Sequence, residues 1–444
     1  MSTASSRTEL FESAPVHKAF FALALPSVFG KIIMLLYNLA DTWFIASTNN
    51  ADIVAGVALI APVFTVMIAL GDIFGVGGSS LISRLMGQKD PSASRRTSGQ
   101  CFYGALTLGA VMTVLLLVIR DPLLTLLGAD SSTYPHARDY YTYIALGAPF
   151  IIANVTPMNL LRAEGMAKAS MLGSISGSVT NILLDPLFIF TFRLGAAGAA
   201  IATVIANMVS LAVYAGFYRK AEWISIAPKF LRFHWADLKN IGAIGIPAAL
   251  NNLMNSFASA LTNRVLVPYG SEAVAAWSIA GRCTMIVTML LVSFSFSSLP
   301  LVGYNYGRRN FGRLKQILKF LYTFEVLLAL SCSAVMALFA PHLVRAFMED
   351  PVIVSLGSRI LRCHLISTCF TAVILISTCT FQATGNAKAT MAATLGRQGL
   401  LFIPILLTAS SLFGFTGILF AQPAADLLTV ALVCFLMKKS RLMG

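Results

Sequence analysis

Residues 19–45 read AFFALALPSVFGKIIMLLYNLADTWFI, and this stretch indicates the class of fold. Its charged residues are Lys31 and Asp41, and the rest is apolar or weakly polar. A helix needs about 20 mainly apolar residues to cross the hydrocarbon core of a bilayer. The stretch is long enough, so we expect it to span a membrane.

Similar runs follow along nearly the whole chain. Of its 444 residues 57% are hydrophobic and 11% are charged, whereas about a quarter of a soluble domain is charged. We therefore predict an all-α membrane protein with twelve transmembrane helices. The predicted spans are 19–45, 53–83, 99–119, 139–161, 169–192, 195–218, 240–268, 273–303, 320–340, 356–381, 389–412 and 415–437.

The formal charge of +14 is distributed in a way that favours a membrane over nucleic acid. Lys and Arg gather in every second loop, as short groups rather than on one folded surface. The positive-inside rule then predicts that these loops and both termini are cytoplasmic, in a multi-pass protein of the cell (inner) membrane. The groups contain Arg84, Lys89, Arg95 and Arg96; Arg219, Lys220, Lys229, Arg232 and Lys239; Arg308, Arg309, Arg313, Lys315 and Lys319; and Lys438, Lys439 and Arg441.

An internal repeat appears when the sequence is displaced by about 220 residues against itself. Pro26 then meets Pro247, RLMGQKD meets YNYGRRN, and RAEGMAKASM at 162–171 meets QATGNAKATM at 382–391. We expect an N-lobe at 1–225, with a cytoplasmic linker beginning near 219, and a C-lobe at 226–444. With six crossings each, the two repeats keep the same orientation and are related by a pseudo-two-fold axis.

Polar residues inside the predicted spans are the candidates for function, because an ionisable group in the bilayer core costs about 2.5–3.5 kcal/mol. Residues three or four apart share a helix face. This pairs Asn38 with Asp41, Asn181 with Asp185, and Thr203 with Asn207, and Asn154 lies on the span between. Two carboxylates among amide and hydroxyl oxygens suit protons or Na⁺. Helix capping or packing between helices is the structural alternative.

The second repeat lacks these acids. The repeat mates of Asp41, Asn181 and Asp185 lie near Thr262, Leu401 and Ile405, while Asn255 is a polar residue on the seventh span. An ion site in one lobe alone is therefore our hypothesis. Six other ionisable residues in apolar runs stay without predicted partners: Asp72, Glu325, Asp426, Lys31, Arg264 and Arg282.

Motifs of catalysis or cofactor binding are absent from the sequence. It contains no phosphate-binding glycine loop, nucleophile elbow or zinc signature, and the seven cysteines show no metal-ligand spacing. We expect no enzyme and no cofactor, with H⁺ or Na⁺ as the coupling ion.

Several ordered segments resemble the MATE (multidrug and toxic compound extrusion) family, nearest its bacterial MepA-like or DinF-like branch. They are LPSVFGKIIMLLYNLADTWFIA, GGSSLISRLMGQKD, LRAEGMAKASM, NILLDPLFIF and LGAAGAAIAT. The resemblance implies a V-shaped fold and an antiporter that exports cationic or amphipathic organic compounds in exchange for H⁺ or Na⁺. It places the ion site at Asp41, Asn181, Asp185 and Thr203, which would also be the Na⁺ ligands.

The substrate would bind in a cleft near this ion site, and a kink at Pro26 would act as the hinge. We assign the cleft to Tyr37, Asn38, Asn154, Glu164, Asn207 and Asn255, and we expect a monomer in a lipid bilayer. One rival function is a flippase for a lipid-linked oligosaccharide or peptidoglycan precursor. A passive channel or a membrane receptor is a rival of a different class.

Overall fold

The computed structural model describes residues 9–230 and 233–440, and the regular structure in these residues is helical. Arg232 and Arg441 of the basic groups and both chain ends lie outside the described residues. Contacts divide the chain into two compact units. Unit 1 contains the chain up to Ser13 and Phe21–Ala249, and unit 2 contains Ala14–Phe20 and the chain from Leu250 onward.

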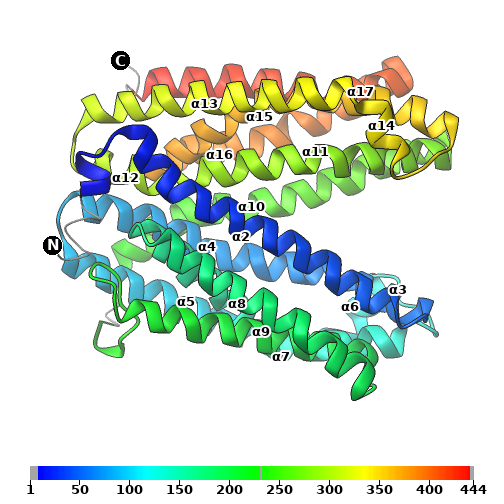
Figure 1. The fold of residues 1–444 in the computed structure, drawn as a ribbon, viewed down its shortest axis with the longest axis horizontal. Helices are drawn as coiled ribbons and strands as arrows, with labels where there is room; N and C mark the ends of the chain where they lie inside the picture. The colour runs from blue at the N-terminus through cyan, green and yellow to red at the C-terminus, as the bar shows by residue number, and fades with distance from the viewer. Residues whose placement is uncertain (1–8, 231–232, 441–444) are drawn as a thin grey trace. The chain divides into compact units, whose positions relative to one another are not determined.

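Unit 1 holds the first six predicted spans (Figure 1). Its helices are α2 (Val16–Ala46, from Phe21), α3 (Ala51–Leu59), α4 (Ala61–Gly87), α5 (Pro91–Val118), α6 (Arg120–Leu126), α7 (Tyr134–Ala163), α8 (Ala167–Pro186), the π-helical segment η1 (Leu187–Thr191), α9 (Gly195–Tyr218) and the 3₁₀ turn η2 (Pro228–Phe230). The second predicted span is divided at Ile60 into α3 and α4.

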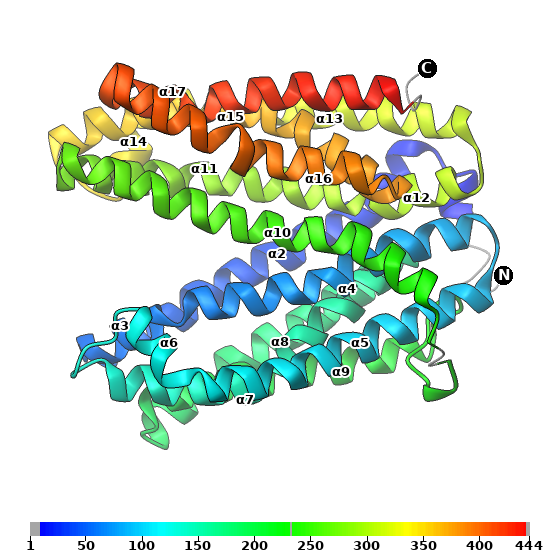
Figure 2. The ribbon, with the colours of Figure 1, turned by 180° about the vertical axis from the view of Figure 1, so that it is seen from behind.

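Unit 2 repeats this order (Figure 2). It contains α10 (Trp235–Leu266, from Leu250), the 3₁₀ turn η3 (Val267–Tyr269), α11 (Ser271–Ser297), α12 (Leu299–Gly307), α13 (Phe311–Leu338), α14 (Ala340–Arg345), α15 (Pro351–Thr384), α16 (Ala387–Leu395), the π-helical segment η4 (Gly396–Leu400) and α17 (Phe402–Lys439). Within α17, Gly414 has φ 56° and ψ −136°, which separates the last two predicted spans.

The boundary between the units lies inside α10 rather than at 225–226. The first part of α10 packs closely on α4, because a Cβ on Gly245 would lie 1.9 Å from the carbonyl oxygen of Ile73. The second part belongs to an apolar cluster of unit 2 that contains Ala258, Leu266 and Phe402. One helix therefore takes part in both units.

Corresponding helices occupy the centre of each unit. In unit 1, α7 packs against α4, α5 and α9, and in unit 2, α15 packs against α11, α13 and α17. Both central helices are the fourth predicted span of their repeat. The cores around them are apolar, as expected where the side chains of neighbouring helices interdigitate.

Turns repeat along with the helices. Lys89 and Arg309 each have φ 60°, and each precedes a residue that caps the next helix. Asp90 accepts a hydrogen bond from the backbone N–H of Ala93, and Asn310 accepts one from that of Arg313. The matched loops RLMGQKD and YNYGRRN thus have the same geometry, which confirms the internal repeat.

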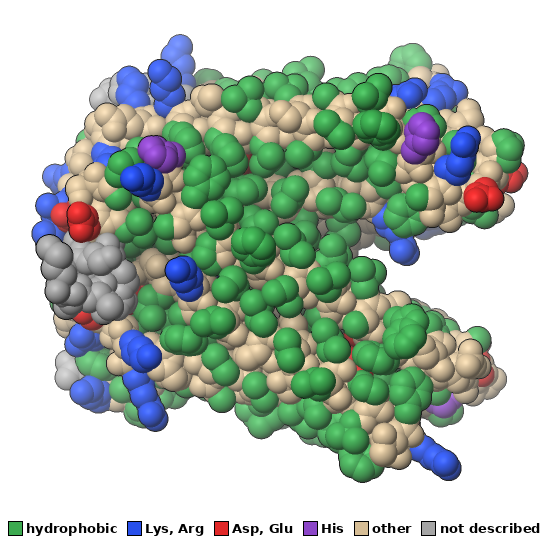
Figure 3. Space-filling view, viewed as in Figure 1, with side chains coloured by type: hydrophobic (Ala, Val, Ile, Leu, Met, Phe, Trp, Pro, Cys, Tyr) green, Lys and Arg blue, Asp and Glu red, His purple; other side chains and the backbone are tan. Residues whose placement is uncertain are grey.

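Ten helical stretches of the described residues are long and apolar enough to cross a membrane. They cover every predicted span except the seventh, 240–268, which corresponds to α10. The stretch Ala387–Lys439 combines the last two predicted spans. Apolar side chains cover the lengths of the helices in each unit, and basic side chains lie toward their ends (Figure 3). The chain is therefore a multi-pass membrane protein.

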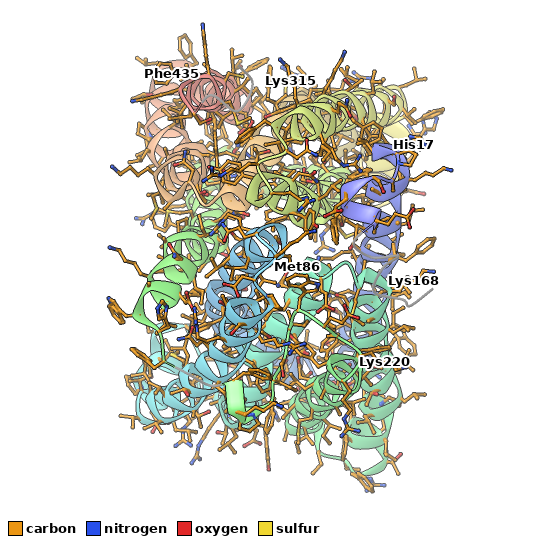
Figure 4. The ribbon with its side chains drawn as sticks, turned by 90° about the vertical axis from the view of Figure 1, so that its left-hand side faces the viewer. His17, Met86, Lys168, Lys220, Lys315 and Phe435 are labelled. Atoms are coloured by element: carbon orange, nitrogen blue, oxygen red, sulfur yellow. The ribbon has the colours of Figure 1, made fainter. Side chains whose placement is uncertain are left out.

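Basic residues of alternate loops reach the same end of a unit. Figure 4 looks onto one end of the helices and labels Met86, Lys168 and Lys220 of unit 1 there. Met86 lies near the end of α4, Lys168 near the start of α8, and Lys220 just after α9. This arrangement agrees with the charge pattern from which the orientation was predicted.

Candidate functional site

The predicted carboxyl pair comes together in unit 1. The side chains of Asp41 on α2 and Asp185 on α8 lie close enough to interact directly. Asp185 is 0% exposed, and its Oδ1 receives no hydrogen bond from an N–H or O–H donor in the described residues. Two ionised carboxylates at close range repel each other, so one proton shared between them stabilises the pair. The pair can therefore hold and exchange a proton.

Asn181 and Thr203 form the second side of the pair. When the side-chain amide of Asn181 is oriented with its nitrogen toward Asp185, this nitrogen donates to Oδ2 of Asp185 at 2.7 Å. In the same orientation the amide oxygen of Asn181 accepts from the backbone N–H of Thr203 at 3.1 Å. The side chain of Thr203 also lies close to that of Tyr37 on α2. All four predicted ion-site residues thus lie in one cluster, together with Tyr37.

Close packing of α8 on α9 makes this cluster. A Cβ on Gly177 would lie 2.0 Å from Oγ of Ser210, and one on Gly173 would lie 2.0 Å from Cε1 of Tyr214. These glycines let the two helix backbones approach, so that Asn181 reaches Thr203. Immediately after Asp185 the α-helix ends at Pro186 and continues as the π-helical segment η1.

A line of polar contacts leads from the carboxyl pair to α7. Asn207 donates to the carbonyl oxygen of Thr203 at 2.8 Å and accepts from Nδ2 of Asn154, also at 2.8 Å. Oδ1 of Asn154 is buried and has no hydrogen-bond partner in the described residues. This oxygen is available to a donor that is not part of the described chain.

Tyr140 is a site residue that the sequence reasoning missed. It lies on α7 within the electrostatic influence of Asp41, Asp185 and Tyr37. Tyr140 and Asn154 share a helix face, since 14 residues make almost four full turns. This spacing could have identified Tyr140 from the sequence. However, a tyrosine in an apolar span is also an ordinary packing residue.

Glu164, another predicted cleft residue, lies away from the cluster around Asp185. Glu164 is 1% exposed at the end of α7, where it accepts from the backbone N–H groups of Glu222 at 2.7 Å and Trp223 at 3.3 Å. Asn154 precedes it by ten residues, or about 15 Å along the helix. The structure thus joins Glu164 to the segment after α9 and not to the carboxyl cluster, so its assignment to the cleft is corrected.

The side chains of Asn38 and Asn255 are exposed and belong to different units. The carbonyl oxygen of Asn38 accepts from Thr42. Asn255 of unit 2 donates to the carbonyl oxygen of Asn251 one turn earlier. Pro26 is buried within α2, which is helical on both sides of it.

Three unassigned acids acquire neighbours in the structure. Asp426 pairs with Arg397, whose Nε lies 3.0 Å from its Oδ1, and Glu325 accepts from Oγ of Ser295 at 2.6 Å. Asp72 lies within electrostatic reach of Lys31 and Arg162 in unit 1. None of these partners could be chosen from the sequence, because each lies on a different helix.

Comparison with known proteins gives the family. The family model MatE matches residues 26–187 and again residues 247–408, so each repeat is recognised separately. The chain belongs to the MATE family. It is 31% identical over 418 residues to the multidrug export protein MepA of Staphylococcus aureus, which covers 94% of this chain and 92% of the relative.

Solved MATE structures share the fold along the whole chain. A multidrug resistance MATE family transporter of the MOP superfamily in an outward-facing conformation has a TM-score of 0.91 and 27% identity, and covers 99% of both chains. A MATE in a bent conformation has a TM-score of 0.92 and 27% identity, and covers 99% of this chain and 98% of that one. The predicted family and the predicted fold class are confirmed.

Proposed function

We propose that this MATE protein exports cationic or amphipathic organic compounds across the cell membrane in exchange for protons. The relative MepA is named a multidrug export protein, and a structural neighbour is described as a multidrug resistance transporter. A small-molecule substrate class is therefore the natural starting point. We propose that the protein works as a monomer, with both termini at the cytoplasmic side where the basic loops gather.

The proximity of Asp41 and Asp185 is the observation that carries the coupling mechanism. A shared proton leaves the pair with one negative charge, and loss of that proton leaves two. Two adjacent carboxylates repel each other and attract a cation. Proton binding and binding of a cationic substrate should therefore oppose each other, as exchange requires.

Na⁺ is the alternative coupling ion at the same place. The oxygens of Asp41, Asn181, Asp185 and Thr203 are of the type that a hard cation prefers. The proximity of the two carboxyl groups favours the proton, because a proton fits between them without moving them apart. Either ion would bring one positive charge inward, which yields about 2.3 kcal/mol per 100 mV of membrane potential.

Substrate recognition follows from the polar line beyond the carboxyls. Oδ1 of Asn154 has no hydrogen-bond partner in the described residues, so it can accept a hydrogen bond from a substrate. The carboxyl pair of Asp41 and Asp185 supplies negative charge. A few fixed polar groups in apolar surroundings suit many amphipathic compounds rather than one. We propose Tyr37, Asn154 and Asn207 as the substrate contacts of unit 1.

Efflux of a cationic dye from proteoliposomes, under pH and Na⁺ gradients imposed separately, tests this function. We expect a pH gradient to drive efflux, and we expect Asp41→Asn and Asp185→Asn each to abolish it while the protein still inserts. Asp121→Asn is the matched control, because this exposed acid pairs with Arg120 on the short helix α6. It should retain normal efflux.

Other results of this efflux experiment would favour a different coupling ion or a different function. Efflux driven by Na⁺ alone would replace the proton as coupling ion. Dye movement that follows neither gradient would indicate a passive channel, and movement of a lipid-linked precursor without dye movement would indicate a flippase. Full activity in both aspartate variants would refute the role of the carboxyl pair.

A further inference from the structure

Unit 2 contains a buried acid that the proposed exchange mechanism does not use. Glu325 lies close to the midpoint of α13, about 20 Å along the helix from either end. Its side chain is 0% exposed. An ionisable group at this depth has no water around it and depends on its protein neighbours.

Those neighbours provide one hydrogen bond. Oγ of Ser295 on α11 donates to Oε2 at 2.6 Å, and Oε1 has no partner in the described residues. No Lys, Arg or His of the described chain forms an ion pair with Glu325 or acts on it electrostatically. The titratable groups that face it are Tyr322 of the same helix and Cys379 of α15, and Cys434 of α17 acts on Tyr322.

Asp426 in the same unit shows what a buried ionised acid requires. It is also 0% exposed, but it receives hydrogen bonds from Arg397, Gln422 and Thr371 in addition to Ser367. Its charge is balanced by the guanidinium of Arg397. Glu325 has neither a cation nor a second donor, so burial of its ionised form would be very costly. In this conformation Glu325 is therefore a neutral carboxylic acid.

The acid is also connected to a break in the helical hydrogen-bonding pattern at Ser298, whose backbone angles stay helical (φ −80°, ψ −17°). Helix α11 ends at Ser297, two residues after Ser295, and α12 begins at Leu299. The carbonyl oxygen of Ser295, at this break, accepts from Oγ of Ser298 at 2.6 Å and from Sγ of Cys379 at 3.1 Å. Ser295 thus links Glu325 to this break between α11 and α12.

We propose that Glu325 is a proton-binding site of unit 2, separate from the carboxyl pair of unit 1, which binds and releases its proton as the break after Ser295 rearranges. Release of the proton would demand new donors for the carboxylate. A shift at the break would supply hydroxyl, thiol or water donors, so the charge on Glu325 and the helix geometry depend on each other. This role rests on the proposed proton-driven export, to which it adds a second proton.

The alternative is a permanently neutral acid that only bonds α13 to α11. Glu325→Gln separates the two roles, because the amide oxygen can still accept from Ser295 while the side chain cannot titrate. Infrared difference spectra of the purified full-length protein, recorded between acidic and alkaline pH, detect a carboxylic acid that loses its proton. They require neither drug nor gradient.

We expect the wild type to show an acid C=O band that disappears at alkaline pH and is missing in Glu325→Gln, with about one proton fewer bound per chain. Ser295→Ala should retain the band at higher frequency, because the C=O loses its hydrogen bond. This variant keeps the acid and tests the assignment even if Glu325→Gln does not fold. Asp426→Asn is the control and should leave the band unchanged.

The proposal is overturned if the Glu325 band persists at every pH at which the protein stays folded, or if no band depends on Glu325. Asp41→Asn and Asp185→Asn must leave the Glu325 band in place, since they lie in the other unit. Failure of gradient-driven dye efflux would refute the exchange function but would not alter these spectra. The two proposals therefore fail in different measurements.

Discussion

Asp426 is surrounded by donors from three parts of unit 2. Arg397 of η4, Gln422 one turn earlier on α17, and Thr371 of α15 all contact it, and Arg397 also donates to Thr371 at 2.8 Å. The repeat mates of Gln422 and Asp426 are Thr203 and Asn207 of unit 1, when RLGAAGAA is matched with LFGFTGIL. The two units thus place polar residues at equivalent positions, but in unit 2 the guanidinium of Arg397 lies beside them.

Removal of that cation should destabilise the protein strongly. Arg397→Ala leaves the carboxylate of Asp426 buried without its ion-pair partner, and we expect a loss of about 3–5 kcal/mol in the free energy of unfolding. The double variant Arg397→Met with Asp426→Leu should recover most of this loss, because no buried charge remains. Thermal unfolding in detergent measures both, and an equally unstable double variant would contradict the explanation.

At this scale the sequence predicted which polar residues of unit 1 lie together, but not all their contacts. The three- and four-residue spacings identified Asp41, Asn181 and Asp185 correctly as parts of polar faces. Tyr140 was missed, and Glu164 was assigned to the wrong place, because spacing along one helix does not reveal what another helix brings to it.

Among the helices, α8 and α9 determine the geometry of the cluster around Asp185. Their close contact depends on Gly173 and Gly177, where a larger side chain would meet Tyr214 and Ser210. In the sequence, Gly173 and Gly177 stand in the stretch MLGSISGSVT at 171–180, and no role was predicted for them. That they face α9 follows from the tertiary packing.

Gly177→Val should push α8 away from α9 and separate Asn181 from Thr203. We expect a loss of about 1–3 kcal/mol in stability, typical of overpacking, together with loss of proton-coupled efflux. Gly216→Ala on α9 is the matched control, since a Cβ there meets nothing within 4 Å. Unfolding curves and dye efflux of both variants check this, and normal efflux in Gly177→Val would count against the packing argument.

Over the whole molecule, the repeat explains most of the architecture. Both units have a central fourth span, the same loop geometry at Lys89 and Arg309, and a proline in the first span at Pro26 and Pro247. Proline cannot donate the helical hydrogen bond to the residue four positions earlier, which weakens the helix there.

Pro26→Ala should therefore slow the transport cycle without unfolding the protein. Alanine restores the backbone N–H and removes the clash of the ring, so α2 becomes straighter and harder to bend. Pro62→Ala is the control, because Pro62 stands in the first turn of α4, where its ring fits an ordinary helix. The efflux rate should fall in the first variant only; equal rates in both would remove Pro26 as a hinge.

By itself, the sequence determined the membrane class, the spans, the repeat and the two carboxylates, because length, hydropathy and helical spacing are local properties. It did not determine which faces meet. Only the tertiary structure joined Asp41 to Asp185, brought Thr203 and Tyr37 beside them, gave Asp426 a cation and left Glu325 without one. The physical reason is that the state of a buried charge depends on groups from other helices, and packing selects those groups.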